Sequence, residues 1–377
     1  MKVLRIIAII TVGAVFVFSG TVKAIDPLGS AYKFHDYFQA FGMGFLQFLS
    51  LPFSIILCLT EFLTGFTILT GIRRREGIWG ALILMIIFTP LTFILALTNP
   101  VSDCGCFGDA VHLTNWQTFG KNMILISFVI FLFSERYKTD GRIRRSYQWI
   151  IASLAALTFT GFILYNLTFL PLIDFLPYST GTYIPGKMMM PAGAPVTQYE
   201  TTFIYEKEGK RKAFSIKDYP AGDSTWKFIE QRSRLIKKGY LPPIHDFSVT
   251  TRDNVNITDS ILRTPDPIIL MVSGKLRGAA RKNLEKGFEA GRKCISDSIG
   301  FYVLTASGSD EISSYDNGLQ FCTTDETTLK TMVRSNPGYI LLIKGTIEGK
   351  WSWANLPENI SERIRKLNST ETNNIQK

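Results

Sequence analysis

The chain has 377 residues, of which 46% are hydrophobic, and a formal net charge of +10. This length accommodates two or three domains of roughly 100–200 residues each. The basic surplus suggests nucleic-acid binding, but about half of it lies within the first 170 residues, beside long apolar runs, which is typical of membrane topology. We therefore expect no nucleic-acid partner. Five cysteines and three scattered histidines give neither a disulfide scaffold nor metal-ligand spacing, so we also expect no metal site.

Five mostly apolar segments are long enough to cross a bilayer, which takes about 17–25 residues in a helix. The predicted spans are approximately 4–22, 46–69, 78–98, 118–133 and 149–170. The fourth has the shortest purely apolar part. The first span could alternatively be a cleaved signal peptide, because basic residues precede its apolar core and Ser19-Gly20 lies near its end.

Basic residues concentrate on alternate connections between these spans. They are Lys2 and Arg5 before the first span, Arg73, Arg74 and Arg75 after the second, and Arg136, Lys138, Arg142, Arg144 and Arg145 after the fourth. The other two connections contain only Lys23, Lys33 and Lys121. Because positively charged loops stay in the cytoplasm, we expect a multi-pass protein of the bacterial inner membrane with a cytoplasmic N-terminus and a periplasmic C-terminal domain.

A closely spaced thiol pair, Cys104 and Cys106, lies in the connection between the third and fourth spans. This connection is predicted to face the oxidising periplasm, where such a pair can form a labile or catalytic disulfide. The nearby carboxylates of Asp103 and Asp109 would raise a thiol pKa, which leaves His112 as the candidate activating group. The pair is therefore a candidate redox site, with a static turn disulfide or two packed thiols as the alternatives.

Glu61 lies inside the second span, where a carboxylate is costly and usually faces a partner or a cavity. Lys23 and Asp26, just after the first span, are its candidate partners. Alternatively, Glu61 is a protonated carboxyl group bonded to a neighbouring Ser or Thr. Cys58, about one helical turn earlier, is expected to be a buried apolar filler.

After the fifth span, the pattern changes to that of a soluble domain. We predict a hairpin at 201–216 with Gly209 in its turn and a short helix at 225–235. Strands are expected at 247–250, 268–272, 300–305, 339–343 and 346–351, with helices at 279–297 and 327–335. This order is thioredoxin-like in outline. The expected domains are a transmembrane bundle at 1–170, a linker with a small hairpin and helix region at 171–240, an α/β thioredoxin-like domain at 241–357 and a polar tail at 358–377.

Three strings in this region carry a resemblance to a known class. They are His245-Asp-Phe-Ser-Val, Asn254-Val-Asn-Ile-Thr-Asp and Ile268-Ile-Leu-Met-Val-Ser-Gly. They resemble the opening of thiol-disulfide reductase domains of the TlpA/peroxiredoxin-like class. Asn336-Pro337-Gly338 resembles the active-site-facing proline of that class, which is usually cis and borders a partner groove.

The dithiol of that class is missing from this domain. A Cys-x-x-Cys would follow the strand that ends at Ser273, but the sequence there continues Gly-Lys-Leu-Arg. Cys294 and Cys322 are too far apart in sequence to replace it. They could form a structural disulfide or stay buried and apolar. The domain is therefore expected to lack its own redox activity.

Four strings in the membrane half carry a second resemblance. They are Phe18-Ser19-Gly20, Lys23-Ala-Ile-Asp26-Pro, Glu61-Phe-Leu-Thr-Gly65 and Asp103-Cys-Gly-Cys-Phe-Gly-Asp109. Over about residues 1–140 the chain resembles the DoxX-like / MauE-like membrane family. MauE-like proteins are implicated in maturing a disulfide-rich periplasmic dehydrogenase, and DoxX-like proteins in quinone-linked electron transfer. The resemblance thus implies quinone as a candidate electron acceptor, although no residue marks a cofactor site.

Two functional hypotheses follow from these patterns. In the first, Cys104 and Cys106 exchange with periplasmic protein thiols and pass electrons through the membrane half. In the second, the chain is a non-enzymatic membrane scaffold whose thioredoxin-like domain binds a partner beside Pro337. The lipid bilayer is a partner in both hypotheses, and whether the chain is an enzyme stays open. A transport function would rest on Glu61 alone.

Overall fold

The computed structural model describes residues 1–101, 104–138, 144–218, 220, 222–237, 239–315, 318–362 and 364. Asp103, Arg142 and residues 365–377 of the predicted polar tail lie outside the described residues. The chain forms two compact units, Met1–Thr182 together with Ser248 onward, and Tyr183–Phe247. The finer domain boundaries at 170, 240 and 357 stay a prediction.

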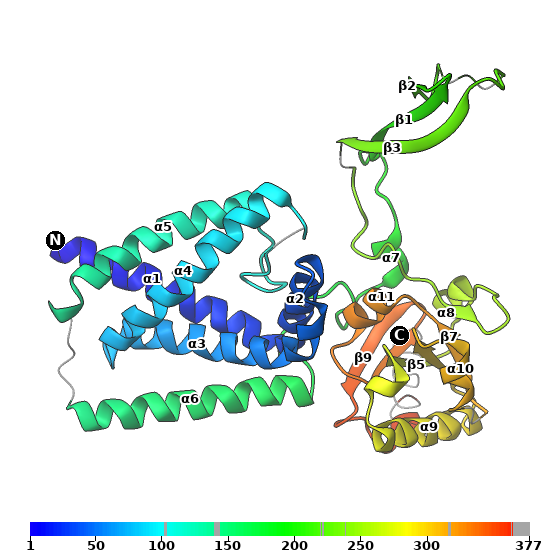
Figure 1. The fold of residues 1–377 in the computed structure, drawn as a ribbon. Helices are drawn as coiled ribbons and strands as arrows, with labels where there is room; N and C mark the ends of the chain where they lie inside the picture. The colour runs from blue at the N-terminus through cyan, green and yellow to red at the C-terminus, as the bar shows by residue number, and fades with distance from the viewer. Residues whose placement is uncertain are drawn as a thin grey trace. The chain divides into compact units, whose positions relative to one another are not determined.

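The first half of the chain is a bundle of long apolar helices (Figure 1). They are α1 (Lys2–Ile25), α3 (Ser50–Thr70, preceded by the 3-10 turn η1 at Gly44–Leu49), α4 (Arg74–Thr98), α5 (Asn115–Ser134) and α6 (Arg145–Thr168). All five are long and apolar enough to cross a membrane, which confirms the predicted spans. Large apolar side chains such as Ile86, Ile124 and Leu157 are more than half exposed on the helix surfaces, as expected for residues that face lipid.

The helix α2 (Pro27–Ala40) was not predicted. It follows α1 after one residue, because Asp26 caps it by accepting a hydrogen bond from the Gly29 amide at 2.8 Å and Pro27 occupies its first turn. An Asp-Pro pair is a standard helix-start signal, so the sequence contained the information. The helix packs against α3 and lies beside the loop that carries Cys104 and Cys106.

The C-terminal domain is built around a six-stranded sheet of order β4-β7-β6-β5-β8-β9. The strands are β4 (Thr250–Thr251), β5 (Ile268–Ser273), β6 (Gly300–Thr305), β7 (Gln320–Thr323), β8 (Gly338–Ile343) and β9 (Thr346–Ser352). β5 pairs in parallel with β6, and β8 is antiparallel to both β5 and β9. The order β5-α9-β6, then α11-β8-β9, is the thioredoxin-like arrangement expected from the sequence.

Short helices complete this domain. They are α8 (Thr258–Arg263), η3 (Leu276–Gly278), α9 (Arg281–Ser296), α10 (Ser309–Ser313) and α11 (Glu326–Met332). The main core lies between the sheet and α9, with Met271, Leu284, Phe288 and Tyr339 fully or almost fully buried. The strand expected at 247–250 is shorter than predicted, because only Thr250 and Thr251 pair with β7.

The second unit contains a small antiparallel sheet of order β2-β1-β3. β1 (Gln198–Lys207) and β2 (Lys210–Ser215) form the predicted hairpin, with Gly209 at φ 75° in its turn. The helix predicted at 225–235 is wrong, because this segment is the strand β3 (Lys227–Lys237). This segment pairs with the free edge of β1, and the Phe228 ring packs against the Tyr205 ring with centroids 5.7 Å apart. These contacts outweigh the local helical pattern. The linker before this sheet contains the short helix α7 (Ile184–Met188).

Candidate functional site

Cys104 and Cys106 lie in the loop between α4 and α5, and their Sγ atoms are 2.6 Å apart. Both are free, half-buried thiols within reach of a disulfide bond. Gly105 adopts a left-handed φ of 62°, and a Cβ there would lie 3.0 Å from Cγ of Lys33. The glycine between the thiols therefore serves both the turn and the close approach of α2.

Side chains from two helices hold the main chain of this loop. The Tyr37 hydroxyl on α2 donates to the Cys104 carbonyl at 2.6 Å, and the Ser19 hydroxyl on α1 donates to the Cys106 carbonyl at 2.7 Å. Phe107 packs edge-on against Phe18 with ring centroids 5.4 Å apart. The bundle thus fixes both cysteine residues through their own carbonyl groups.

The two thiols differ in acidity because they share one hydrogen bond. A hydrogen bond from Cys106 lowers the pKa of Cys104 to about 6, against the opposing effect of burial. The Thr118 hydroxyl, 3.5 Å from Cys104 Sγ, and the Lys121 ammonium group lower it further. The pKa of Cys106 is raised well above its usual range, first by its bond to Cys104 and then by burial. Cys104 is therefore the thiolate and Cys106 the protonated thiol of the pair.

Besides Cys106, the groups that lower the pKa of Cys104 are Thr118 and Lys121, which the sequence analysis did not suggest, and a role of His112 stays a prediction. His112 is exposed, whereas Thr118 and Lys121 lie one helical turn apart on α5 and act on Cys104. Asp109 is paired with Arg334 at 2.9 Å. The (i, i+3) spacing of a hydroxyl and an ammonium group at the start of α5 was the signal that the sequence analysis missed.

Glu61 and Lys23 form a buried ion pair beneath the thiol pair. Lys23 Nζ contacts Glu61 Oε1 at 2.9 Å and Oε2 at 2.7 Å, and it donates to the Ser19 hydroxyl at 2.7 Å. Ser19 Oγ also lies 2.9 Å from Glu61 Oε2. All three residues are at most 6% exposed. The structure thus selects Lys23 rather than Asp26 as the partner of Glu61.

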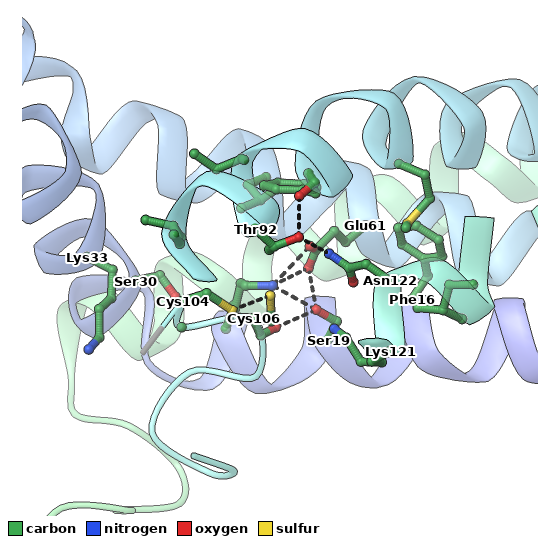
Figure 2. Close-up of a pocket in the computed structure, with 18 of the residues that line it drawn as sticks. Phe16, Ser19, Ser30, Lys33, Glu61, Thr92, Cys104, Cys106, Lys121 and Asn122 are labelled. Carbon is green, nitrogen blue, oxygen red and sulfur yellow. Dashed lines mark hydrogen bonds and ion pairs between the residues drawn. The ribbon is translucent and has the colours of Figure 1, made fainter. Parts of the chain in front are cut away.

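A cavity of about 90 Å³ joins this polar cluster to the thiols (Figure 2). Its polar lining comprises Ser19, Lys23, Ser30, Lys33, Tyr37, Glu61, Thr92, Lys121 and Asn122 together with Cys104 and Cys106. Its apolar lining comprises Val15, Phe16, Phe34, Leu57, Met85, Phe88, Leu91, Leu95 and Leu125. Apolar side chains, one buried ion pair and two thiols therefore line the same cavity.

The Asp26 carboxylate forms an ion pair with a residue of the thioredoxin-like domain. Arg334, between α11 and β8, contacts Asp26 at 2.7 Å and Asp109 at 2.9 Å, and it is 5% exposed. Burial raises the pKa of Asp26, and the Arg334 charge opposes that effect. Arg334 also lies over the Tyr32 ring, 5.2 Å from its centroid. Asp26 thus belongs to the attachment of this domain rather than to the Glu61 cluster.

The Asn336-Pro337 peptide bond is cis, as the resemblance implied. Where a reductase domain would carry its dithiol, the Ser273 hydroxyl donates to the Asn336 side chain at 2.7 Å, and Asn336 donates to the Lys275 carbonyl at 3.2 Å. Gly338 is buried at the start of β8. Polar side chains thus replace the missing cysteines, and a partner groove at this place stays a prediction.

The remaining cysteines are free and buried. Cys294 lies in α9 and Cys322 in β7, so the structure does not contain the disulfide that the sequence allowed. Burial raises the pKa of each of these two thiols to about 11. Cys58 is fully buried beside Phe159 and Ile163, as predicted for an apolar filler. Among the residues that the structure describes, no cluster of three or more His, Cys, Asp or Glu side chains could hold a metal ion.

Comparison with known proteins identifies two parts of the chain. Residues 1–134 match the family model described as methylamine utilisation protein MauE, which confirms the MauE-like resemblance. Residues 199–238, which include most of β1 and all of β2 and β3, match a domain of unknown function, DUF8463. With its five apolar helices, the chain is a multi-pass membrane protein. The likeness to DoxX proteins stays a prediction.

One curated relative and one solved structure are also similar. Protein TlpB of Flavobacterium psychrophilum is 27% identical over 136 residues, which cover 35% of this chain and 37% of that protein. The chain thus spans little more than a third of the length of this relative. A solution structure of a provisionally assigned protein disulfide isomerase from Bacteroides thetaiotaomicron aligns with 33% of this chain and 84% of its own, at 14% identity and a TM-score of 0.26.

Proposed function

We propose that this chain carries out thiol-disulfide exchange at the periplasmic face of the bacterial inner membrane, with Cys104 as the reactive sulfur and Cys106 as its partner. The observation that carries the proposal is the asymmetry of the pair. Two thiols 2.6 Å apart have their pKa values displaced in opposite directions by their shared hydrogen bond. A low-pKa nucleophile beside a resolving thiol is the arrangement that thiol-disulfide exchange requires.

The direction of the exchange is oxidation of a client. A client thiolate attacks Cys104 in the Cys104–Cys106 disulfide, the Cys106 sulfur leaves, and a client–Cys104 disulfide forms. A second client thiolate attacks the client sulfur of that bond and releases Cys104 as a thiolate. The client loses two electrons and two protons and gains a disulfide, while the pair becomes a Cys104 thiolate and a Cys106 thiol and the second proton passes to solvent. The low pKa of Cys104 makes it a good leaving group and stabilises the reduced pair, which favours client oxidation.

The reduced pair needs an electron acceptor, and we assign this role to a lipid-soluble quinone. A quinone takes up two electrons and two protons, which is the stoichiometry of dithiol oxidation. The apolar side chains of α1, α3, α4 and α5 that line the cavity next to the thiols support this assignment. Phe16, Met85 and Leu95 are among these side chains.

The orientation is part of the proposal. The connections that contain Arg73–Arg75 and Arg144 would face the cytoplasm, which puts the loop of Cys104 and the thioredoxin-like domain in the periplasm. That domain lacks its own dithiol, so its role would be to bind clients or to support the loop.

Mixed-disulfide trapping tests the proposal. In cells, the Cys106→Ser variant should accumulate a disulfide between Cys104 and a periplasmic protein, because the resolving thiol is absent. The Cys104→Ser variant is the matched control and should trap nothing. The wild-type chain, but not the Cys104→Ser/Cys106→Ser variant, should restore disulfide formation in a deficient strain. Unchanged periplasmic disulfides and no trapped protein would instead support the non-enzymatic scaffold.

A further inference from the structure

The proposed reaction changes the protonation of Cys106 in every cycle. Cys104 leaves and returns as a thiolate near neutral pH and needs no proton donor. Cys106 is a half-buried thiol whose pKa is raised, so its sulfur must gain a proton when it leaves and lose one when the disulfide is formed again. A group that lines the same cavity is placed to hold that proton, because Cys106 itself lines the cavity.

Glu61 is the sole carboxylate among the described residues that line this cavity. The other charged groups of the lining, Lys23, Lys33 and Lys121, are ammonium groups, which donate hydrogen bonds and have no acceptor atom. Asp26 and Asp109 bind Arg334 instead. The composition of the cavity therefore leaves Glu61 as the candidate proton acceptor.

Glu61 lines the same cavity as Cys106, and Ser19 links its carboxylate to the Cys106 main chain. Ser19 Oγ lies 2.9 Å from Glu61 Oε2 and 2.7 Å from the Cys106 carbonyl oxygen. Lys23 binds both carboxylate oxygens and the same hydroxyl. The positive charge of Lys23 also acts on the Cys106 thiol. Figure 2 shows Ser19, Glu61 and the two cysteines gathered at one part of the cavity.

We infer that Glu61, held by Lys23 and Ser19, exchanges a proton with the Cys106 sulfur during disulfide formation and cleavage at the Cys104–Cys106 pair. This inference rests on the proposed function. When Cys106 attacks a mixed disulfide on Cys104, its S–H proton passes to the Glu61 carboxylate, the new S–S bond forms, and the former partner leaves as a thiolate. In the opposite direction, the Glu61 carboxyl group returns the proton to the departing Cys106 sulfur.

Glycines contribute to the packing of α1 against α3 beside this ion pair. α1 and α3 approach through glycines, because a Cβ on Gly20 would lie 2.6 Å from the Phe62 amide nitrogen and one on Gly65 would lie 2.5 Å from the Gly13 carbonyl oxygen. Replacing a buried ion pair with apolar side chains is often neutral or stabilising. A costly pair that faces a cavity shared with two thiols is better explained by their chemistry.

The test uses the full-length protein in detergent, fully reduced, mixed with a chromogenic aromatic disulfide in a stopped-flow instrument. Attack by Cys104 releases one aromatic thiolate, and closure by Cys106 releases the second. The Cys106→Ser variant identifies the first phase, and the Cys104→Ser/Cys106→Ser variant supplies the background of the other cysteines. The rate of the second phase measures proton loss from Cys106.

In Glu61→Gln we expect an unchanged first phase and a second phase that is about 100-fold slower and accelerates with rising pH, because water must take the proton. Glu61→Asp should recover a large part of the rate. Since Glu61→Gln leaves Lys23 unpaired, the Lys23→Gln/Glu61→Gln variant is measured as well and should show the same slow second phase.

The outcomes separate the two proposals. A normal second phase in both Gln variants, or an equal slowing of both phases, would make Glu61 a structural residue and leave the proposed function intact. Absence of the first phase in the wild-type protein would overturn the proposed function and this inference together.

Discussion

Arg334 and Asp109 form a 2.9 Å ion pair although 225 residues separate them in the sequence. Asp109 follows Cys106 by three residues, and Arg334 precedes the cis-proline of the thioredoxin-like domain by three. The same guanidinium group binds Asp26 at the start of α2, so one buried arginine connects the domain without a dithiol to the loop that has one. This relationship is the basis of the first prediction.

Replacing Arg334 with Ala should destabilise the folded protein, because it leaves two largely buried carboxylates without their cation. Removing one partner of a buried pair costs about 3–5 kcal/mol. Thermal unfolding in detergent should show a clear loss for Arg334→Ala. Arg263→Ala, which removes an exposed ion pair with Asp259, is the control and should change little. Equal unfolding temperatures for the two variants would contradict the assigned role of Arg334.

The reactivity of Cys104 should depend on pH with a midpoint near 6. A lowered pKa means that the thiolate is already populated above pH 6, so the alkylation rate should rise between about pH 5 and 7 and then level off. An ordinary thiol would continue to gain reactivity beyond pH 8. Rate measurements with iodoacetamide across this range provide the check.

Three substitutions around Cys104 test the cause of that midpoint. Cys106→Ala removes the hydrogen bond that is the largest cause of the lowered pKa, so the midpoint should move upward, whereas Cys106→Ser keeps a donor and should move it less. Lys121→Gln should give a smaller upward shift than Cys106→Ala, because the charge of Lys121 lowers the pKa less than the hydrogen bond from Cys106 does. If none of the three substitutions changes the midpoint, neither Cys106 nor Lys121 is the cause of the lowered pKa of Cys104.

The glycines between α1 and α3 should not tolerate a methyl group. In Gly20→Ala or Gly65→Ala the added Cβ would meet main-chain atoms at 2.6 Å or less, which forces the helices apart. Overpacking of this kind costs about 1–3 kcal/mol. Gly120→Ala and Gly161→Ala are matched controls in α5 and α6, where a Cβ meets nothing within 4 Å. Thermal unfolding of the four purified variants should separate the two pairs, and equal stabilities would contradict the glycine-mediated contact.

Single cysteines introduced at two sites should label from opposite sides of the membrane. In a chain with Cys104 and Cys106 replaced by Ser, Val111→Cys should react with an impermeant maleimide on intact spheroplasts. Glu76→Cys should react only after lysis, because Arg73–Arg75 are predicted to hold that connection in the cytoplasm. The reverse labelling pattern would invert the proposed orientation and place the thiol pair in the cytoplasm.

Local properties of the sequence predicted much of this fold. Five long apolar runs became five helices, and the order of strands and helices after residue 245 was largely correct, because apolar length and periodicity depend on neighbouring residues. The missed helix α2 had a local Asp-Pro signal, whereas the errors in the strands were non-local. β3 took its conformation from pairing with β1, and β4 was limited to the two residues that pair with β7.

The sequence by itself determined that the chain spans a membrane and carries one closely spaced thiol pair between two spans. Only the tertiary structure decided which thiol is the acidic one, because the hydrogen bond between the two thiols has the largest effect and Thr118 of α5 adds a hydrogen bond to Cys104. It also paired Lys23 with Glu61 and gave Asp26 to Arg334. The physical reason is that the length of an apolar segment depends only on consecutive residues. A hydrogen bond or a buried ion pair depends on which distant segments the fold brings together.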